Sequence, residues 1–321
     1  MKTKNPEELV AYLKELWLDN SMLETQLPKL KEAPQADVHG QYFPTDTEMI
    51  RFNYSLHNLG EGKGIEISSY TMQVHSFSEI THVKAGHINT ADVEDVLRLI
   101  PWNQEAITHN PGVKVLLQRF MEMRENETAR PVIDELLGRY WKNTQMEQAV
   151  SFPITSNAVV KEMSFPITGQ ITDIDLQEGF NLIQGRAVLK PVLDEMGIVL
   201  SPLQSQWLME EGGALAAYPD FDFRRCFYDL PATVRPVLKR DYMEKAISGH
   251  LIPAHMENKG ENMPGFLWID PRIAGLRFTD LKGTAFDVPK PVAKKQQSTV
   301  KAPPIKSKAK VDKKKTTGIK R

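Results

Sequence analysis

The last 33 residues restrict the fold of this chain to the residues that precede them. Residues 289–321 contain 11 Lys and one Arg against the single acid Asp312, include five Pro or Gly, and have no aromatic residue. Such a segment buries too little apolar surface to offset the entropy of ordering it, so we expect a disordered basic tail. Any globular core must therefore form within residues 1–288.

The net charge of -1 conceals a strong asymmetry between these two parts. Because the tail carries +11, residues 1–288 contain 28 basic and 40 acidic residues, a net charge of -12. A basic end on an acidic body indicates a polyanionic partner or an interaction tail. The overall composition, with 41% hydrophobic and 25% charged residues, is typical of a globular protein.

The single cysteine and the lengths of the apolar runs indicate where in the cell the protein resides. Cys226 has no second cysteine for an intramolecular disulfide or a thiolate zinc site, and its aromatic neighbours favour burial. The start, MKTKNPEELV, has no apolar signal region, and no apolar run approaches the roughly 18 residues of a membrane-spanning helix. We therefore expect a cytoplasmic protein without a membrane span.

The N-terminal segment predicts an amphipathic helix that begins after the N-cap Asn5 and that Pro28 stops or kinks. Its apolar residues recur at alternating spacings of four and three, as in a coiled coil with one polar residue at its centre. The residues of this seam are Leu9, Leu13, Leu16, Asn20, Leu23, Leu27 and Leu30. Two interpretations remain open: the helix packs on its own domain or a second helix, or it self-associates and the protein has a structural assembly role.

A predicted hairpin follows this helix. The segments Met49–Leu56 and Ile65–Val74 are rich in β-branched and aromatic residues and flank a loop with three glycines. The loop resembles a phosphate-binding loop, but Gly64 occupies the position after Lys63 where that motif needs Ser or Thr. We therefore interpret it as a turn.

Helices are expected between residues 90 and 142, at Asp92–Ile100 after a Thr90 cap, at Val113–Met123, and from Pro131 to Trp141. The pentapeptide Ser-Phe-Pro-Ile-Thr then occurs at residues 151–155 and 164–168. Because proline cannot donate in a central ladder, the repeat favours two edge strands or two arms of one motif. The change from helix-prone sequence to β-prone runs with proline predicts a domain boundary near residue 148.

A looser recurrence marks the second half. A helix-prone stretch, a glycine and an apolar run succeed one another at residues 182–189, 208–215 and 246–252. A strand, turn and strand are expected over 265–271 and 275–278. The sequence thus predicts an α+β fold with an N-terminal domain (1–148), a C-terminal domain of helix–Gly–strand modules (149–288) and the Lys-rich tail (289–321).

These modules carry a resemblance to known proteins. The stretch from Asp241 to Gly249, the Lys259-Gly260 turn, and the strands Phe266–Pro271 and Leu276–Phe278 resemble small modules in uncharacterised accessory proteins of Bacteroides-type conjugative transposons. Such modules recur beside, or fused to, type IA topoisomerases and mobilisation functions, and the strand Ile65–Val74 looks like one that these proteins also contain. The resemblance covers about a third of the chain. It implies a mobile-element accessory protein and no catalytic residue.

The sequence shows no motif for a named reaction. His75, His82 and His87, followed by Asp92 and Glu94, suggest a metal-dependent enzyme as an alternative. The five-residue spacing of His82 and His87 places them on different helical faces, however, and favours ordinary surface or core histidines. The acid pairs Asp173/Asp175 and Asp220/Asp222 are more typical of turns than of cation sites. We therefore expect no catalytic residue, metal or cofactor.

The tail is the main candidate site. Lysines are mobile point charges that suit phosphate backbones, and without aromatic side chains they provide neither stacking nor base readout. The hypothesis is a non-enzymatic, DNA-associated accessory protein of a mobile or phage-like element that binds DNA or RNA non-specifically and salt-dependently. Alternatives for the tail are an acidic protein surface, the body included, or no specific partner. The proposed nucleic-acid-binding residues are Lys294, Lys295, Lys301, Lys306, Lys308, Lys310, Lys313, Lys314 and Lys315.

Overall fold

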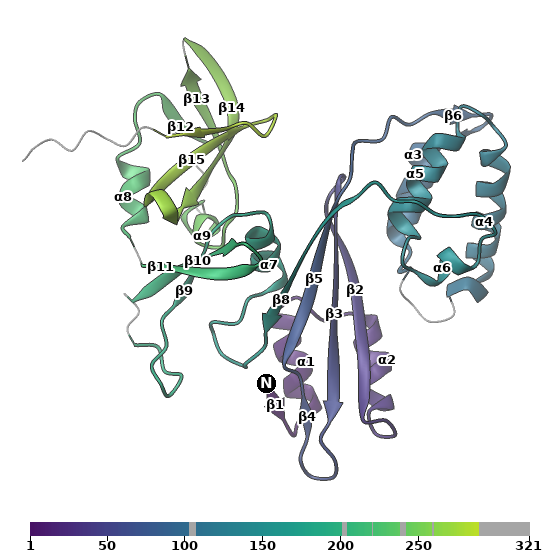
Figure 1. The fold of residues 1–321 in the computed structure, drawn as a ribbon, viewed down its shortest axis with the longest axis horizontal. Coiled ribbons are helices and arrows are strands. Elements are labelled where there is room, and N and C mark those ends of the chain that lie inside the picture. The colour runs from purple at the N-terminus through teal and green to yellow at the C-terminus, as the bar shows by residue number, and fades with distance from the viewer. Residues whose placement is uncertain (103–106, 201–203, 220, 238–241, 259, 289–321) are drawn as a thin grey trace, which may run out of the picture.

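The chain folds into a central antiparallel sheet flanked by a helical lobe on one side and a β-rich C-terminal lobe on the other (Figure 1). It is an α+β structure with 31% helix and 34% strand, which confirms the predicted fold class. The predicted disordered tail lies outside the described residues. The computed structural model describes residues 1–288 apart from 103–106, 201–203, 220, 238–241 and 259.

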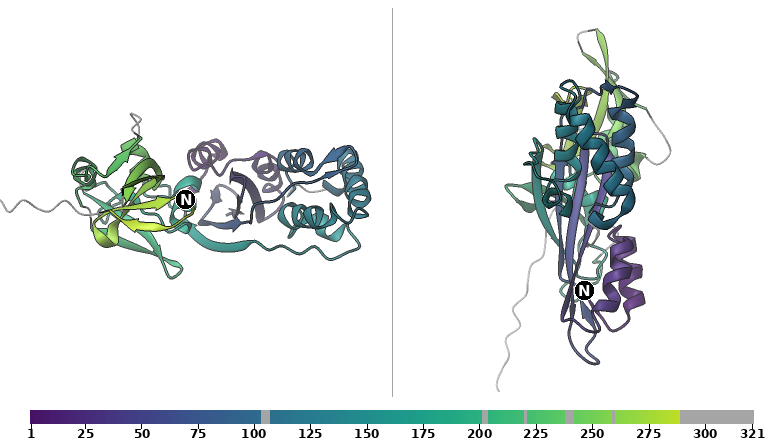
Figure 2. Two further views of the ribbon diagram at one scale, coloured as in Figure 1. Left: turned by 90° about the horizontal axis from the view of Figure 1, so that it is seen from above. Right: turned by 90° about the vertical axis from the view of Figure 1, so that its right-hand side faces the viewer.

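The central sheet has six strands in the order β1-β4-β3-β5-β8, with β2 paired to β3. Helices α1 and α2 cover one of its faces, as the view from above shows (Figure 2). These elements are β1 (Lys2–Thr3), α1 (Pro6–Glu15), α2 (Ser21–Lys29), β2 (Gln35–Thr45), β3 (Glu48–Asn58), β4 (Ile65–Glu66), β5 (Ser69–Ser76) and β8 (Val159–Pro166).

Buried and more exposed side chains alternate along β3 and β5, as expected for strands that have one face covered by helices. Side chains at every second position of β3, from Ile50 to Leu56, are buried in the core under α1 and α2. The predicted hairpin is confirmed, because Ile50 pairs with Val74 and Tyr54 with Tyr70. Gly40 on β2 lies under the Phe52 ring, where a Cβ atom would come within 2.0 Å of the ring carbons.

The prediction of one continuous N-terminal helix is wrong. Helix α1 ends at Glu15 with Leu16 as its C-cap. Trp17 then adopts a left-handed φ of 60°, and Leu18 N donates to Leu13 O, as in a Schellman motif. Asn20 is the N-cap of α2 and accepts from Met22 N and Leu23 N. It is therefore a cap and not the polar centre of a coiled-coil seam.

The leucines of the predicted seam pack inside the protein. Five of them belong to the core cluster shared with the central sheet, and Leu27 packs against that cluster. This arrangement matches the first interpretation, packing on the helix's own domain, and leaves these side chains unavailable to a second chain. The five are Leu9, Leu13, Leu16, Leu23 and Leu30.

The helical lobe is inserted between β5 and β8, which pair with each other. Its helices confirm the sequence prediction, except that Asn89 and not Thr90 caps the first of them. Trp102, Phe120 and Trp141 form the centre of its core. The elements are β6 (Lys84–Ala85), β7 (Ile88–Asn89), α3 (Thr90–Leu99), η1 (Ile107–His109), α4 (Pro111–Arg124), α5 (Arg130–Tyr140) and α6 (Gln145–Gln148).

Helix α7 (Leu176–Ile183) joins the central sheet to the C-terminal lobe. Phe180 and Leu182 lie in the core of the central sheet, whereas Asn181 Nδ2 donates to Ser248 O of the C-terminal lobe at 2.6 Å. The other elements of that lobe are β9 (Val188–Pro191), β10 (Ser205–Glu211), β11 (Ala214–Pro219), α8 (Phe223–Tyr228), β12 (Val234–Pro236), α9 (Tyr242–Ile247), β13 (Ile252–Asn258), β14 (Glu261–Asp270), η2 (Pro271–Ile273), β15 (Gly275–Asp280) and β16 (Ala285–Asp287).

Two of the three predicted helix–Gly–strand units are present. In α7–β9 and α9–β13 the linking glycines, Gly185 and Gly249, have φ of 75° and 80°, which glycine adopts freely. The prediction for residues 208–215 is wrong, because β10 and β11 form a hairpin through Gly212 and Gly213. The predicted strand, turn and strand are β14, η2 and β15.

The residues on the two sides of the predicted boundary near residue 148 share one sheet. The second Ser-Phe-Pro-Ile-Thr copy enters edge strand β8, as predicted, whereas the first, at residues 151–155, forms neither helix nor strand. No helix within the described part of the chain is long and apolar enough to cross a membrane.

Candidate functional site

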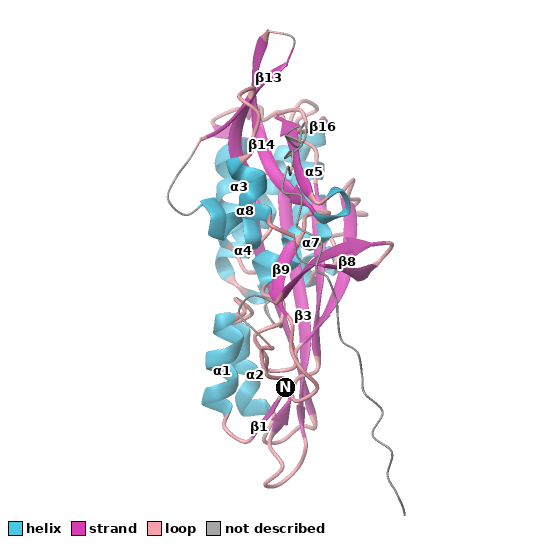
Figure 3. Cartoon of the chain, turned by 90° about the vertical axis from the view of Figure 1, so that its left-hand side faces the viewer, coloured by secondary structure: helices cyan, strands magenta, loops and turns pink. Residues whose placement is uncertain are grey.

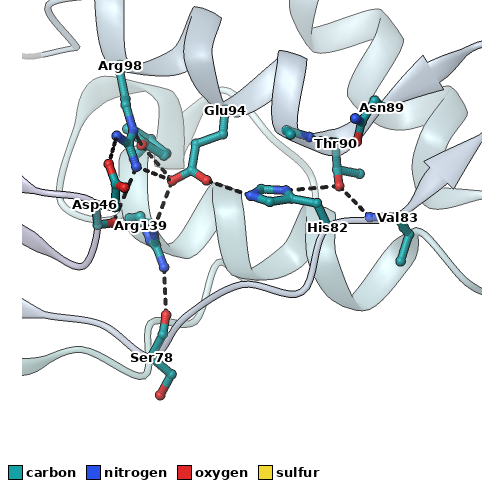
Figure 4. Close-up of polar contacts among 11 residues, drawn as sticks. Asp46, Ser78, His82, Val83, Asn89, Thr90, Glu94, Arg98 and Arg139 are labelled. Atoms are coloured by element: carbon teal, nitrogen blue, oxygen red, sulfur yellow. Dashed lines mark hydrogen bonds and ion pairs between the residues drawn. The ribbon is translucent and has the colours of Figure 1, made fainter. Parts of the chain in front are cut away.

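A group of charged side chains surrounds Glu94 on α3 (Figure 4). Glu94 lies on the buried stripe of this helix with Thr90 and Leu97 and is only 5% exposed. A carboxylate in that position needs partners, because an unpaired buried charge is strongly destabilising. We call this group the Glu94 cluster; its other members are Asp46, His82, Thr90, Arg98, Arg139 and Tyr140.

Three donors converge on one oxygen of Glu94. Arg139 Nη1 donates to Glu94 Oε1 at 2.8 Å, and the Tyr140 hydroxyl donates at 2.9 Å. Arg98 Nη2 lies 3.4 Å from the same oxygen. Arg139 is itself 3% exposed, so the two charges compensate each other away from water.

The second oxygen of Glu94 faces His82. His82 Nε2 lies 3.1 Å from Glu94 Oε2, and His82 Nδ1 lies 3.1 Å from Thr90 Oγ1, which also accepts from Val83 N. Both ring nitrogens are therefore engaged.

The cluster also links the helical lobe to the central sheet. Arg98 Nη1 donates to Asp46 Oδ1, in the β2–β3 turn, at 2.5 Å, and Arg139 Nη1 donates to Asp46 O at 3.1 Å. Arg139 Nη2 donates to Ser78 O, and the guanidinium lies over the Phe77 ring at 4.7 Å. Two cations of the helical lobe thus bind Asp46 of the central sheet across the junction.

Three members of the cluster have shifted pKa values. Burial raises the pKa of Tyr140, as does the Glu94 charge. Burial lowers the pKa of Arg98, but its bonds to Asp46 and Tyr140 raise that pKa overall. The bond from Arg98 also lowers the pKa of Asp46. Both Glu94 oxygens are thus occupied, and the arginines bound to Glu94 also hold the helical lobe to the central sheet.

The structure assembles only part of the predicted histidine site. It brings His82 to Glu94, whereas His75 is buried on β5, and His87 and Asp92 line a separate cleft of about 280 Å³ between α3 and α4. Within the described residues, no three His, Cys, Asp or Glu side chains are grouped so that they could hold a metal ion.

His75 and Arg51 lie together where the sheet meets the helical lobe. Burial and the nearby Arg51 charge lower the pKa of His75 to about 4. Arg51 Nη1 donates to Lys142 O at 2.8 Å, but its buried Nε and Nη2 have no partner among the described residues. Burial lowers the pKa of Arg51 to about 10.

The acids that the sequence pairs have structural roles. Asp173 accepts from Thr168 N and from the Tyr12 hydroxyl, and Asp175 caps α7 in a capping box with Glu178. Asp222 caps α8, and Asp220 lies outside the described residues. These carboxylates therefore organise turns and helix starts, as the turn interpretation predicts.

Two adjoining clefts follow strand β2. One, of about 450 Å³, lies between the start of α2 and the end of α3, and the other, of about 430 Å³, extends from it toward α1. Asn20, Gln41 and Tyr42 line both. Arg98 is the point at which the first cleft meets the Glu94 cluster.

Sequence reasoning missed most of the Glu94 cluster. Asp46, Arg98, Arg139 and Tyr140 come from a turn and two helices that only the tertiary fold brings together. A usable signal existed in Glu94 itself, which stands where the helical period requires an inward-facing residue. The nine lysines proposed to bind nucleic acid, Lys294 to Lys315, lie outside the described residues.

Comparisons of this chain with protein-family models, with curated proteins and with solved structures found no match.

Proposed function

We propose that this protein is a non-enzymatic nucleic-acid-associated accessory protein whose Lys-rich tail binds phosphate backbones. The observation that carries the proposal is the charge asymmetry, +11 over residues 289–321 against -12 over residues 1–288. An acidic body repels a polyanion, so attraction must come from the tail. Its role in a mobile or phage-like element rests only on the resemblance of residues 241–278 and 65–74.

The composition of the tail defines the mode of binding. Each lysine that neutralises a phosphate releases a condensed counterion, so affinity falls steeply with salt. The tail has one arginine and no aromatic side chain, and it therefore lacks both bidentate guanine contacts and base stacking. Binding through the tail alone should be independent of nucleotide sequence.

The Glu94 cluster supports a non-enzymatic role for the body. Each of its two arginines is paired with a carboxylate, and both nitrogens of its histidine are engaged. These charges stabilise the junction of two lobes, which leaves the lobes as surfaces for protein contacts.

A charge-replacement experiment tests the proposal. In the full chain, the nine lysines named above are replaced by Gln in one variant and by Arg in a matched control, and binding to a 30-bp duplex is measured by gel shift between 50 and 300 mM salt. For the parent chain and the Arg control we expect a slope of log K against log salt of about -4 to -8, which corresponds to roughly four to nine phosphates. The Gln variant should show no shift.

Two outcomes would overturn the proposal. One is equal retention of duplex by the Gln variant and the parent chain. The other is a parent chain that ignores DNA and RNA at 50 mM salt but binds polyglutamate, because that result would assign the tail to an acidic protein partner.

A further inference from the structure

Helix α8 presents an aromatic ring and a cation to solvent. Its Phe223 and Phe227 are buried in the core of the C-terminal lobe, so the next positions, Arg224 and Tyr228, point outward one helical turn apart. Tyr228 is 77% exposed, an unusual degree for an aromatic side chain. Figure 3 shows α8 on the side of this lobe turned away from the central sheet.

Of the two arginines on α8, one is paired with a carboxylate and the other is not. Asp222 accepts from Arg225 N as the N-cap, and Arg225 Nε pairs with Asp229 at 3.0 Å. Arg224 is exposed, lies over the Phe223 ring at 5.4 Å, and has no carboxylate partner within the described part of the chain. One cation on this helix therefore remains available to an anionic ligand.

This helix lies close to the point where the tail begins. Cys226 of α8 lies 4.0 Å from Ala274 O, immediately before β15. Strand β16 pairs with β15, Asp287 opposite Arg277, so the next residue, Val288, falls opposite Leu276. Val288 is therefore separated from Ala274 by two residues along β15 and by one spacing between strands. These two steps together correspond to a distance of at most about 10 Å. The first tail lysine, Lys290, follows two residues later.

We propose that Arg224 and Tyr228 form a platform for single-stranded nucleic acid, on which one base stacks on Tyr228 while Arg224 contacts a neighbouring phosphate. The platform rests on the proposed function, since the tail lysines supply most of the attraction. It adds what the tail lacks, because the tail has no aromatic side chain. Side chains four residues apart on a helix lie about 6 Å apart, which suits a base and its adjoining phosphate.

The choice of a single strand follows from access to the bases. Stacking on an exposed aromatic ring needs a base whose face is free, and in a duplex the neighbouring pairs cover both faces. The tail binds the phosphates of either form, whereas the α8 platform distinguishes them. The protein should therefore prefer a single strand over a duplex at equal charge.

Fluorescence anisotropy with a labelled 20-nucleotide oligo-dT and a 20-bp duplex tests this inference on the full chain. We expect Tyr228→Ala to weaken oligo-dT binding about tenfold, the loss of roughly one stacked base, and to change duplex binding less than twofold. Tyr228→Phe should bind as the parent chain does, and Arg224→Gln should weaken oligo-dT binding severalfold. Tyr42→Ala removes another exposed aromatic side chain, 43% exposed on the central sheet, and should have no effect.

The outcomes separate this inference from the proposed function. Parent-like oligo-dT binding by Tyr228→Ala, or an equal loss on both ligands, would overturn the platform and leave the tail proposal intact. If the parent chain binds neither ligand at 50 mM salt, the tail proposal fails and the platform fails with it. Circular dichroism confirms folding, which this exposed substitution should not disturb.

Discussion

The Glu94 cluster and the C-terminal end of the protein use charge in opposite ways. In the cluster, each guanidinium has a carboxylate within 2.8 Å, and the two central side chains, Glu94 and Arg139, are almost fully buried. At the other end, Arg224 is exposed without an acid partner among the described residues, and the 12 basic residues of the tail face one acid in their own segment. Charge satisfied within the fold stabilises the fold, whereas unsatisfied charge at the surface is available to a partner.

The largest expected effect on stability comes from removing the centre of the cluster. Glu94→Ala leaves the buried Arg139 without its carboxylate and should lower the free energy of unfolding by about 3–5 kcal/mol. Urea denaturation at pH 7 measures this change, with the exposed Glu125→Ala as a control that should stay within about 0.5 kcal/mol of the parent chain. If the folded Glu94→Ala protein lost nucleic-acid binding, the division between the two regions would be wrong.

The next effect depends on pH and concerns His75. Its folded pKa of about 4 lies below the ordinary 6.5, so between these values the unfolded chain binds a proton that the folded chain does not. The stabilisation is complete above about pH 6.5 and is lost as the pH falls toward 4, to the extent of about 3 kcal/mol. Urea denaturation at pH 7 and pH 4.5 should show this loss in the parent chain and a smaller one in His75→Gln. Equal losses in the two proteins would contradict the buried neutral state.

A smaller effect of opposite sign is expected at Arg51, whose Nε and Nη2 atoms are buried but which lacks an acid partner in the described part of the chain. Arg51→Met removes one bond to Lys142 O and also a desolvated charge, so stability should stay equal or rise by about 1 kcal/mol. Arg139→Met, in contrast, should be destabilising. Thermal unfolding measures the stability of both variants. An equal loss of stability in the two would show that ion pairing does not distinguish Arg51 from Arg139.

Local chemistry made much of the fold predictable. The β3–β5 hairpin and the glycines that end α7 and α9 follow from neighbouring residues. The break between α1 and α2 was hidden because Trp17 occupies a left-handed position where glycine is usual. The leucine spacing fits the two separate helices as well as it fits one.

Long-range pairing limited the remaining predictions. Strand β8 returns to β5 after the whole helical lobe, and nothing in its own sequence specifies that partner. The same holds for the Glu94 cluster, in which Asp46 and Arg139 stand 93 residues apart. The candidate lysines did not depend on long-range pairing, because the net charge of the tail follows from its amino-acid composition alone.

The most direct test of the central claim is the affinity of residues 1–288 for nucleic acid, compared with that of residues 1–321, at 50 mM salt. All described helices and strands lie within the shorter chain. If unsatisfied charge in the tail supplies the attraction, the full chain binds both oligo-dT and duplex, and the truncated chain binds either at least a hundredfold more weakly, a difference of about 2.7 kcal/mol. Equal binding by the two chains would contradict the account.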